Sequence, residues 1–594
     1  MDDQLAKSSR LRLKTVVRLF HLLATIACLA TLVCTSCAWG QDRNRWADAP
    51  TTAAPRNGLQ IFDWVLIGLY AVTTILIGWY FGRKQTSTKD YFIGSGNMNP
   101  ALIGISLFAT LLSTISYLSL PGEMVGKGPA ILANYLSYPM IFLIIAFGLL
   151  PAYMKHRVTS AYELLELKLG LSVRLLGATM FLLLRLVWMS LLVYLAAKAM
   201  SVMMGIDEKW VPVIVLFTGS VAVIYTSIGG LRAVVVTDAM QTALLFGGAV
   251  LVIITVTYEF GGFGWFPDQW QSNWDVQSIL PVSERSWFDP GIRVTVLGGI
   301  LSTMVWYVCT AGGDQTSVQR FMATRDLKAA RWASAVQLMV GSIVGITLGF
   351  VGMALLGYFK AHPDALPSDM TIANNADDVF PRFIAYHLPV GVSGLVVSAM
   401  FAAAMSSIDS GVNSITAVVS TDYLDRFGWR AKTERGHLLF ARILALSIGA
   451  VVVFGSSFMG LIPGNITAVT NKTVNLLTAP IFGLFFFALF VSFARPAGVW
   501  AGAICGTLVS GMIAFSGPLV TFVHLKFGIP VETFGVELHT TINPTTGVEQ
   551  VMAGDPISFQ WIGPAGLLVD LVVGLVVSGL IVCLGNRKSN GSPS

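Results

Sequence analysis

Long apolar runs recur along this chain from Ile61 to Leu584, and each is long enough to cross a lipid bilayer. Only 12% of the 594 residues are charged, against about 25% in soluble proteins. The pattern predicts an all-α polytopic membrane protein surrounded by the lipid bilayer. About thirteen transmembrane helices are expected, near 61–82, 99–121, 131–153, 172–203, 209–228, 232–259, 292–313, 331–358, 390–421, 437–462, 467–491, 495–522 and 558–585.

Residues 1–40 form a separate element. Five basic residues precede an apolar run from Leu19 to Ala38, and the small residue Gly40 follows shortly after it. This order is typical of a secretory signal peptide, and an extra helix retained in the mature chain is the alternative. Either interpretation predicts that 41–60 is an extracytoplasmic segment.

Basic residues gather in alternate loops between the runs. The opposite loops are rich in acidic and aromatic residues, as in 265–287 and 364–378. The positive-inside rule then predicts a multi-pass protein of the cell (inner) membrane, with the mature N-terminus outside and the tail 586–594 in the cytoplasm. The net charge of +6 comes from these loops and does not indicate nucleic-acid binding. The basic loops contain Arg83, Lys84 and Lys89; Lys155 and Arg157; Arg320, Arg325, Lys328 and Arg331; Arg426, Arg430, Lys432 and Arg435; and Arg587 and Lys588.

Two of the apolar runs are unusual because they carry residues that favour a break in a helix. The second has six hydroxyl side chains and ends at Pro121, and the seventh contains Gly298, Gly299, Gly312 and Gly313. They lie five spans apart, so they cross the membrane in opposite directions, as matching members of two inverted repeats do. We therefore expect repeats at 97–260 and 290–491, a peripheral first helix at 61–82, and two peripheral helices in 495–585. Ordinary packing of small residues is the alternative.

The ninth run carries a cluster of polar side chains on one face. Ala403, Ser406, Ser407 and Ser410 have helical i, i+3, i+4, i+7 spacing, and Asp409 lies beside them. Oxygen atoms gathered at membrane depth suit a small hard cation, and interhelical packing is the alternative interpretation.

Ionisable residues inside the predicted spans need a partner or a cavity, and three of them bear on function. Asp238 and Asp409 lie at similar depth in spans that run in opposite directions, and they make a possible second cation or proton site. Two structural hydrogen-bond acceptors are the alternative. Arg185 lies near the middle of the fourth span, where it would bind either a substrate carboxylate or an internal partner.

Several motifs together resemble the sodium:solute symporter family, which includes sodium/glucose, proline, iodide, monocarboxylate and sialic acid cotransporters. The resemblance covers about residues 61–522. The motifs are Asp90-Tyr91-Phe92-Ile93-Gly94, the stretch from Gly104 to Glu123, Gly229-Gly230-Leu231-Arg232-Ala233-Val234 with Asp238 and Gln241, Asp314-Gln315 with Val318-Gln319-Arg320, and the Ser406-Ser407 helix ending at Asp422.

The resemblance implies a leucine-transporter-type fold of five plus five inverted helices, with Na+ as the coupling ion. It places sodium at the carbonyls of Ala109, Leu112 and Ala403 and the hydroxyls of Ser406 and Ser407. A second site in some members maps onto Asp238, Ser406, Asp409 and Ser410, where Asp409 replaces a serine. The residues expected to contact the substrate are Ser113, Ser116, Tyr117, Arg185, Tyr307, Thr310, Asn471 and Asn475.

The resulting hypothesis is a sodium-coupled secondary active symporter that imports a small polar solute as a monomer. The stretch from Ser106 to Glu123 resembles the iodide, monocarboxylate, multivitamin and sialic acid branches more than the glucose branch. This resemblance implies a small organic anion of monocarboxylate or sialic acid type, or an iodide-like anion. A sodium/sugar symporter is the alternative, and a sensor or a channel fits less well. The sequence carries no HExxH, P-loop or GxSxG motif, so an enzyme is not expected.

Overall fold

Long apolar helices make up most of this protein, because a backbone that crosses hydrocarbon has to satisfy its polar groups internally. The computed structural model describes residues 58–589 except 84, 86, 157, 276–289, 369, 373–374, 430, 460–465 and 543–548. The predicted signal at 1–40, most of the segment 41–60 and the end of the tail 586–594 lie outside the described residues.

Eleven of the described helices are long and apolar enough to cross a membrane, and a bent pair adds a twelfth span. The helices of the first half of the chain are α2 (Ile61–Gly82), α3 (Thr88–Ile93), η1 (Gly94–Gly96), α4 (Pro100–Leu111), α5 (Thr114–Gly126), η2 (Pro129–Ser137), α6 (Tyr138–Leu143), η3 (Ile144–Leu149), α7 (Leu150–His156), α8 (Glu163–Leu169), α9 (Leu171–Met204), η4 (Glu208–Trp210) and α10 (Val211–Glu259).

Helix α10 contains a break at Gly230. Its 49 residues would extend about 74 Å as one straight helix, more than twice the thickness of a bilayer core. Gly230 has φ 59° and ψ −172°, a backbone that favours glycine. A Cβ there would also lie 2.8 Å from the carbonyl oxygen of Tyr91. The break divides α10 at the boundary between the two predicted spans 209–228 and 232–259.

The second half of the chain repeats the pattern of long helices. Its elements are α11 (Val296–Gly313), α12 (Gln315–Met322), α13 (Leu327–Ala361), η5 (Pro363–Ala365), α14 (Ala376–Tyr386), α15 (Val392–Val418), η6 (Val419–Leu424), α16 (Glu434–Ser456), α17 (Ile466–Phe490), α18 (Pro496–Ala514), α19 (Ser516–Phe527), η8 (Val531–Phe534), β1 (Leu538–Ile542), β2 (Glu549–Ala553), η9 (Phe559–Trp561) and α20 (Ile562–Ser589).

Three details differ from the sequence-based expectation. The seventh run is one helix through Gly298 and Gly299. It breaks only at Asp314, which has extended φ and ψ and caps the N-terminus of α12. The run 495–522 ends at Ala514, and α19 follows as a separate helix. Strands β1 and β2 form an antiparallel hairpin that the all-α expectation omitted. Its strands are only five residues each, too short to stand out beside the helical runs.

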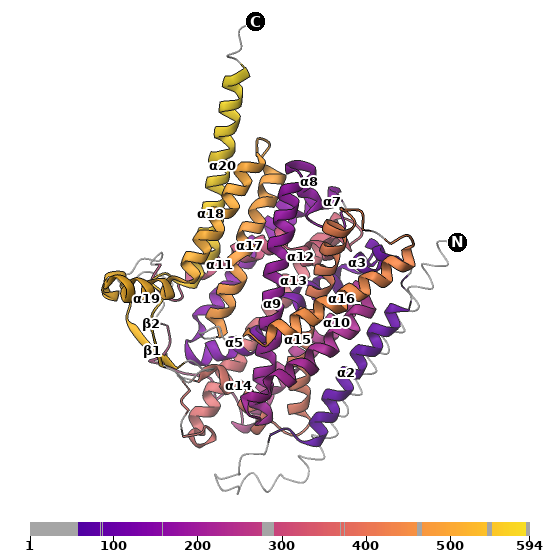
Figure 1. Ribbon diagram of the computed structural model, residues 1–594. Helices are drawn as coiled ribbons and strands as arrows, with labels where there is room; N and C mark the ends of the chain where they lie inside the picture. The colour runs from indigo at the N-terminus through magenta and orange to yellow at the C-terminus, as the bar shows by residue number, and fades with distance from the viewer. Residues whose placement is uncertain are drawn as a thin grey trace.

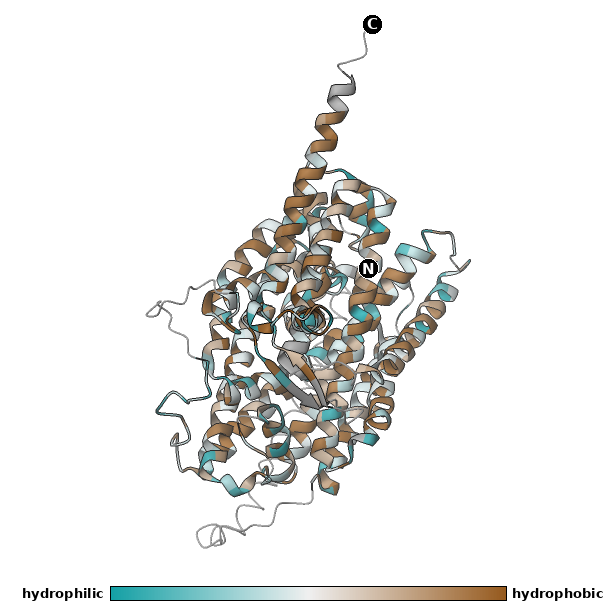
Figure 2. Cartoon of the chain, turned by 60° about the vertical axis from the view of Figure 1, so that its left-hand side comes forward, coloured by the Kyte–Doolittle hydropathy of each residue, from teal (hydrophilic) through white to brown (hydrophobic). Residues whose placement is uncertain are grey.

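Helix α15 is the centre of the bundle, and all of its residues except Leu395 are buried. It contacts α2, α4, α5, α9, α10 and α16, and Figure 1 shows it inside the group of long helices. Helix α2 lies at one edge, and α18 and α20 pack together at the opposite side. Apolar residues also cover the outer faces of the helices, as Figure 2 shows, which is the surface expected against lipid.

Candidate ion and substrate site

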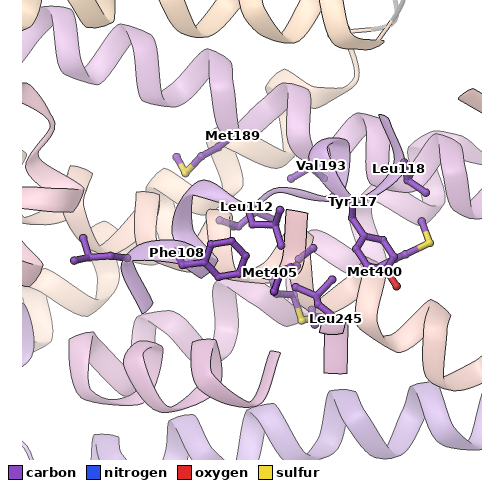
Figure 3. Close-up of a cluster of buried hydrophobic side chains, with 14 of the residues drawn as sticks. Phe108, Leu112, Tyr117, Leu118, Met189, Val193, Leu245, Met400 and Met405 are labelled. Atoms are coloured by element: carbon purple, nitrogen blue, oxygen red, sulfur yellow. The ribbon is translucent and has the colours of Figure 1, made fainter. Parts of the chain in front are cut away.

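The second predicted span is broken in its middle. Helix α4 ends at Leu111, Leu112 has an extended backbone, and α5 continues at an angle of 61°. The Ser113 side chain caps α5 by accepting a hydrogen bond from the Ser116 amide at 3.3 Å. A helix break leaves backbone carbonyls outside the hydrogen-bond ladder. Figure 3 shows Leu112 and Tyr117 at this break, beside Met400 and Met405 of α15.

The serine face of α15 lies directly against the broken helix. The Ser406 hydroxyl donates to the carbonyl of Ala109 at 2.8 Å and lies 3.1 Å from the carbonyl of Ala403. The Ser407 hydroxyl donates to the Thr110 carbonyl at 3.3 Å. Both serines are buried. The structure therefore brings carbonyl and hydroxyl oxygens of two helices together within hydrogen-bonding distance.

A second polar cluster surrounds Asp238, which is fully buried on α10. Its carboxylate accepts hydrogen bonds from the Ser106 hydroxyl and from Arg320, whose Nη2 lies 3.3 Å from Oδ2. The guanidinium of Arg320 also donates to Ser106 at 2.8 Å through Nε and to Ser410 through Nη2. A positive charge of the protein itself thus lies between Asp238 and Ser410.

The prediction that Arg320 lies in a basic cytoplasmic loop is wrong. Arg320 lies on α12 with no exposed side-chain surface. After the break at Asp314 the chain continues as α12, whose residues are all buried, and Arg320 therefore lies inside the protein. A guanidinium is stable there because it has four hydrogen bonds to protein oxygens.

Asp409 points to a different side of the same cluster. Its carboxylate accepts hydrogen bonds from the Tyr225 hydroxyl and from Ser410, at 3.2 Å for the latter. The Ser410 hydroxyl also lies 2.9 Å from the Thr110 hydroxyl. One carboxylate oxygen of Asp238, Oδ1, is buried without a hydrogen-bond partner in the described part of the chain.

Arg185 forms an ion pair with Asp314. Of the two partners that the sequence left open for this arginine, a substrate carboxylate or an internal residue, the structure shows the internal residue. The pair borders a cavity of about 20 Å³ between α4, α9, α11 and α17. Two polar atoms near it, Nε of Arg185 and Oγ1 of Thr310, are buried without a partner among the described residues. The cavity is lined by Thr110, Leu111, Leu184, Arg185, Trp188, Trp306, Thr310, Asp314, Val474 and Thr478.

Five of the other residues expected at the substrate, Ser113, Ser116, Tyr117, Tyr307 and Asn475, do not line this cavity. Ser113 and Ser116 are at the helix break, where their hydroxyls lie 3.5 Å apart. The Tyr117 ring packs on Phe380 with 5.6 Å between centroids. The Tyr307 hydroxyl lies 2.7 Å from that of Tyr138.

The last two expected residues are both on α17. Asn475 is buried, and its side-chain oxygen would lie 3.2 Å from a Cβ added to Gly563. The side chain of Asn471 lies outside the described residues.

The family model of the sodium:solute symporter family matches residues 91–506. This protein belongs to the sodium:solute symporter family. The match includes the broken helix, the α15 serines and the Asp238 cluster, and sodium is the coupling ion of this family.

Curated relatives of this symporter cover most of its length. A sodium/sialic acid symporter of Proteus mirabilis is 29% identical over 74% of this chain and 86% of its own. The sodium-dependent multivitamin transporter of Oryctolagus cuniculus is 26% identical over 91% and 86%. The sodium-coupled monocarboxylate transporter 1 of Homo sapiens is 26% identical over 90% and 89%.

One solved structure supports the fold. A sodium-coupled sialic acid symporter in a substrate-bound, outward-open state matches with a TM-score of 0.69 and 23% identity, over 88% of this chain and 98% of that one. The leucine-transporter-type fold expected from the sequence is confirmed by this likeness.

Ion pairs connect α8 and α9 with η6 and the segment that follows it. Arg174 on α9 donates to Asp422 at 2.7 Å and also pairs with Glu166 on α8. Glu166 binds Arg426 at 2.8 Å as well. These arginines, Arg426 first, hold the pKa of Glu166 below its usual range. Helix α15 and its continuation η6 are thereby tied to α8 and α9.

Proposed function

We propose that this symporter carries a small organic anion into the cell together with sodium, by alternating access and as a monomer. No covalent bond of the solute is made or broken. Its N-terminal side faces outward and its C-terminus the cytoplasm, in agreement with the basic loops. The observation that carries the proposal is the 2.8 Å hydrogen bond from Ser406 to the Ala109 carbonyl across the helix break.

Sodium would bind between α4 and α15. The ligands are the carbonyls of Ala109, Leu112 and Ala403 and the hydroxyls of Ser406 and Ser407. The residues fit the ion, because all five supply neutral oxygens, and the Ser406 hydroxyl oxygen already lies 2.8 Å from the Ala109 carbonyl and 3.1 Å from the Ala403 carbonyl. An ion at this place holds α15 against the broken helix and stabilises one state of the transporter.

The cluster of Asp238, Ser406, Asp409 and Ser410 has a different role in this proposal. The Arg320 guanidinium already provides positive charge between Asp238 and Ser410. A sodium ion there would be repelled by that charge at close range. We therefore assign one sodium ion to each transport cycle and assign Asp409 to the hydrogen-bond network of Tyr225 and Ser410.

The solute would bind at the cavity beside Arg185. The free Nε of Arg185 and the Thr310 hydroxyl offer donors to an anion. Asp314 contacts the guanidinium through Nη2 alone, and a solute carboxylate can replace it and bind the guanidinium in a bidentate manner. Carboxylic acids are the shared chemistry of sialic acid and monocarboxylate substrates, the solutes that the relatives' names give.

The test is uptake into proteoliposomes with an inward sodium gradient. A panel of sialic acids, monocarboxylates, vitamin-type carboxylates, iodide and neutral sugars is compared in sodium and in choline. Sodium-dependent uptake of a carboxylate supports the proposal, and uptake of a sugar alone contradicts it in favour of the sugar alternative.

Arg185→Gln with Asp314→Asn removes both charges of the pair together, so it avoids leaving one charge buried and alone. This double variant is expected to fold and to lose carboxylate uptake, whereas Asp314→Asn alone retains a binding guanidinium.

A further inference from the structure

Asp570 is a carboxyl group buried inside a membrane-spanning helix and far from the proposed sodium site. It lies on α20, within the apolar sequence Leu567-Leu568-Val569-Asp570-Leu571-Val572-Val573. Its side chain is completely buried. It lies eight residues after the start of α20 at Ile562, which is about 12 Å along the helix. Neither the sodium site nor the cavity beside Arg185 includes it.

The surroundings of Asp570 are made by glycines of two neighbouring helices. A Cβ added to Gly502 of α18 would lie 2.6 Å from Oδ1 of Asp570, and one added to Gly506 would lie 2.8 Å from its Cβ. A Cβ on Gly483 of α17 would overlap Oδ2. Three glycines on two helices therefore leave a space of the size of this carboxyl group.

The two carboxyl oxygens have no hydrogen-bond partner in the part of the chain that the structure describes. No basic side chain donates a hydrogen bond to Asp570 in that part of the chain either. The Cys309 thiol of α11 is the titratable group close enough to interact with it electrostatically. Lys472 of α17 is paired with Asp555 at 2.6 Å instead. The other titratable groups on these helices are Tyr307 on α11, Cys505 on α18, and Cys583, Arg587 and Lys588 on α20, the last three at least thirteen residues further along α20.

An ionised carboxylate without partners is very costly in an apolar interior. A sodium ion could offset the charge, but it needs several oxygen ligands, and this place offers one carboxyl group among glycines of intact helices. A proton needs no further ligand. We propose that Asp570 is a proton-binding site at the junction of α17, α18 and α20.

Proton binding at Asp570 can affect transport through α17, because this helix contacts both Asp570 and the cavity beside Arg185. Helix α17 carries Val474 and Thr478, which line the cavity beside Arg185, and it carries Gly483 against Asp570. The neutral acid allows α17 to pack closely on α18 and α20. Release of the proton requires water to reach the carboxylate, and the entry of water separates α17 from α18 and α20. This role is independent of the proposed solute.

Dicyclohexylcarbodiimide tests the site because it modifies protonated carboxyl groups in apolar surroundings. The full-length protein in proteoliposomes is treated at several pH values, in sodium and in choline, and the modified residue is located by mass spectrometry of its peptide. We expect modification of Asp570 that decreases as the pH rises and is equal in both salts. Asp570→Asn should lower the modification of this peptide more than tenfold, while Asp555→Asn, which changes a loop carboxylate near the same helices, should leave it unchanged.

Two results would overturn the proposal. Protection of Asp570 by sodium at constant pH would show a metal cation site, and absence of modification at every pH would show a solvated or paired carboxylate. Thermal unfolding provides a second measurement, because an amide has the shape and neutrality of the protonated acid. Asp570→Asn should keep Tm within about 2 °C of the wild type. A much larger fall would show that the carboxylate form is needed. None of these readouts depends on sodium-driven uptake.

Discussion

The proposed sodium site is built from single oxygen atoms, and Ser406 is the residue at which their contribution is most easily measured. Its hydroxyl lies between the carbonyls of Ala109 and Ala403. Ser406→Ala removes one ligand of the proposed ion. A hydrogen bond or ligand contact to a charged group contributes about 1.5–3 kcal/mol. The sodium concentration for half-maximal uptake should therefore rise at least about tenfold.

Ser398 offers a matched control on the same helix. It is also buried, but its hydroxyl bonds to the Gly394 carbonyl one turn earlier at 2.8 Å and faces no break. Ser398→Ala should leave the sodium requirement near that of the wild type. An unchanged requirement in Ser406→Ala would remove this residue from the ion site.

The residues of the candidate site differ in how far the sequence could predict them. The α15 serines could be recognised because helical spacing fixes which side chains share a face. The place of Arg320 could not, since the sequence shows a basic residue shortly after a span, as in any cytoplasmic loop. The buried helix α12 that follows the break at Asp314 places it against Ser106 and Asp238. Contacts between residues more than a hundred positions apart, such as Arg185 with Asp314, leave no local signal.

At the scale of elements, the turn in α10 depends on one glycine. Gly230 has a positive φ, and an added Cβ would meet Tyr91 and Gln85 at 2.7–2.8 Å. Gly230→Ala should therefore lower the free energy of unfolding by about 2 kcal/mol, measured as a lower Tm. Gly247→Ala is the control, because that glycine lies on the same helix and an added Cβ meets nothing within 4 Å. Equal Tm values for the two variants would contradict the role of Gly230.

A second element-scale prediction concerns the ion pairs that tie α8 to η6 and to the segment after it. The depressed pKa of Glu166 means that its contribution to stability is present above its ordinary pKa of about 4.3. That contribution is lost as the pH falls further, through the lower pKa of the folded state. The Tm of the wild type should decrease over this acidic range. Glu166→Gln should lower Tm at neutral pH and decrease less on acidification.

The control for this experiment is Glu537→Gln, in an exposed loop before β1. It should follow the wild type at every pH. An acid transition of the same size in Glu166→Gln would show that other groups cause it.

Helix breaks and helix lengths were predictable to different degrees. Hydroxyl-rich and glycine-rich segments indicated both breaks, because they supply side-chain caps and flexible backbone at Ser113 and Gly313. The position of the second break was less certain, since Gly298 and Gly299 carry the same signal within an intact helix. There the Asn134 and Gln560 side chains pack closely on the glycines, so close approach explains them. This approach comes from η2 and η9, which the local sequence does not show.

For the whole molecule, the number of charges moved in one cycle follows from the two polar clusters together. Neutral oxygens at Ser406 and Ser407 suit one sodium ion, whereas the Arg320 guanidinium supplies the charge in the Asp238 cluster. The arginine moves with the protein and is not carried to the other side with the solute. One sodium ion and one monovalent organic anion then add up to no net charge. Transport of such a solute should be electroneutral.

This stoichiometry predicts how uptake responds to voltage. A potential of 100 mV contributes about 2.3 kcal/mol for each net charge that crosses, and nothing when the net charge is zero. Proteoliposomes with a fixed sodium gradient and a valinomycin-set, inside-negative potassium potential should accumulate a monocarboxylate to the same level as liposomes without the potential. A second sodium ion would make the cycle carry one positive charge, and the same potential would then raise the accumulation of the solute. Voltage-stimulated accumulation would thus place an ion beside Asp238 despite Arg320, so this single measurement distinguishes the two assignments of the cluster.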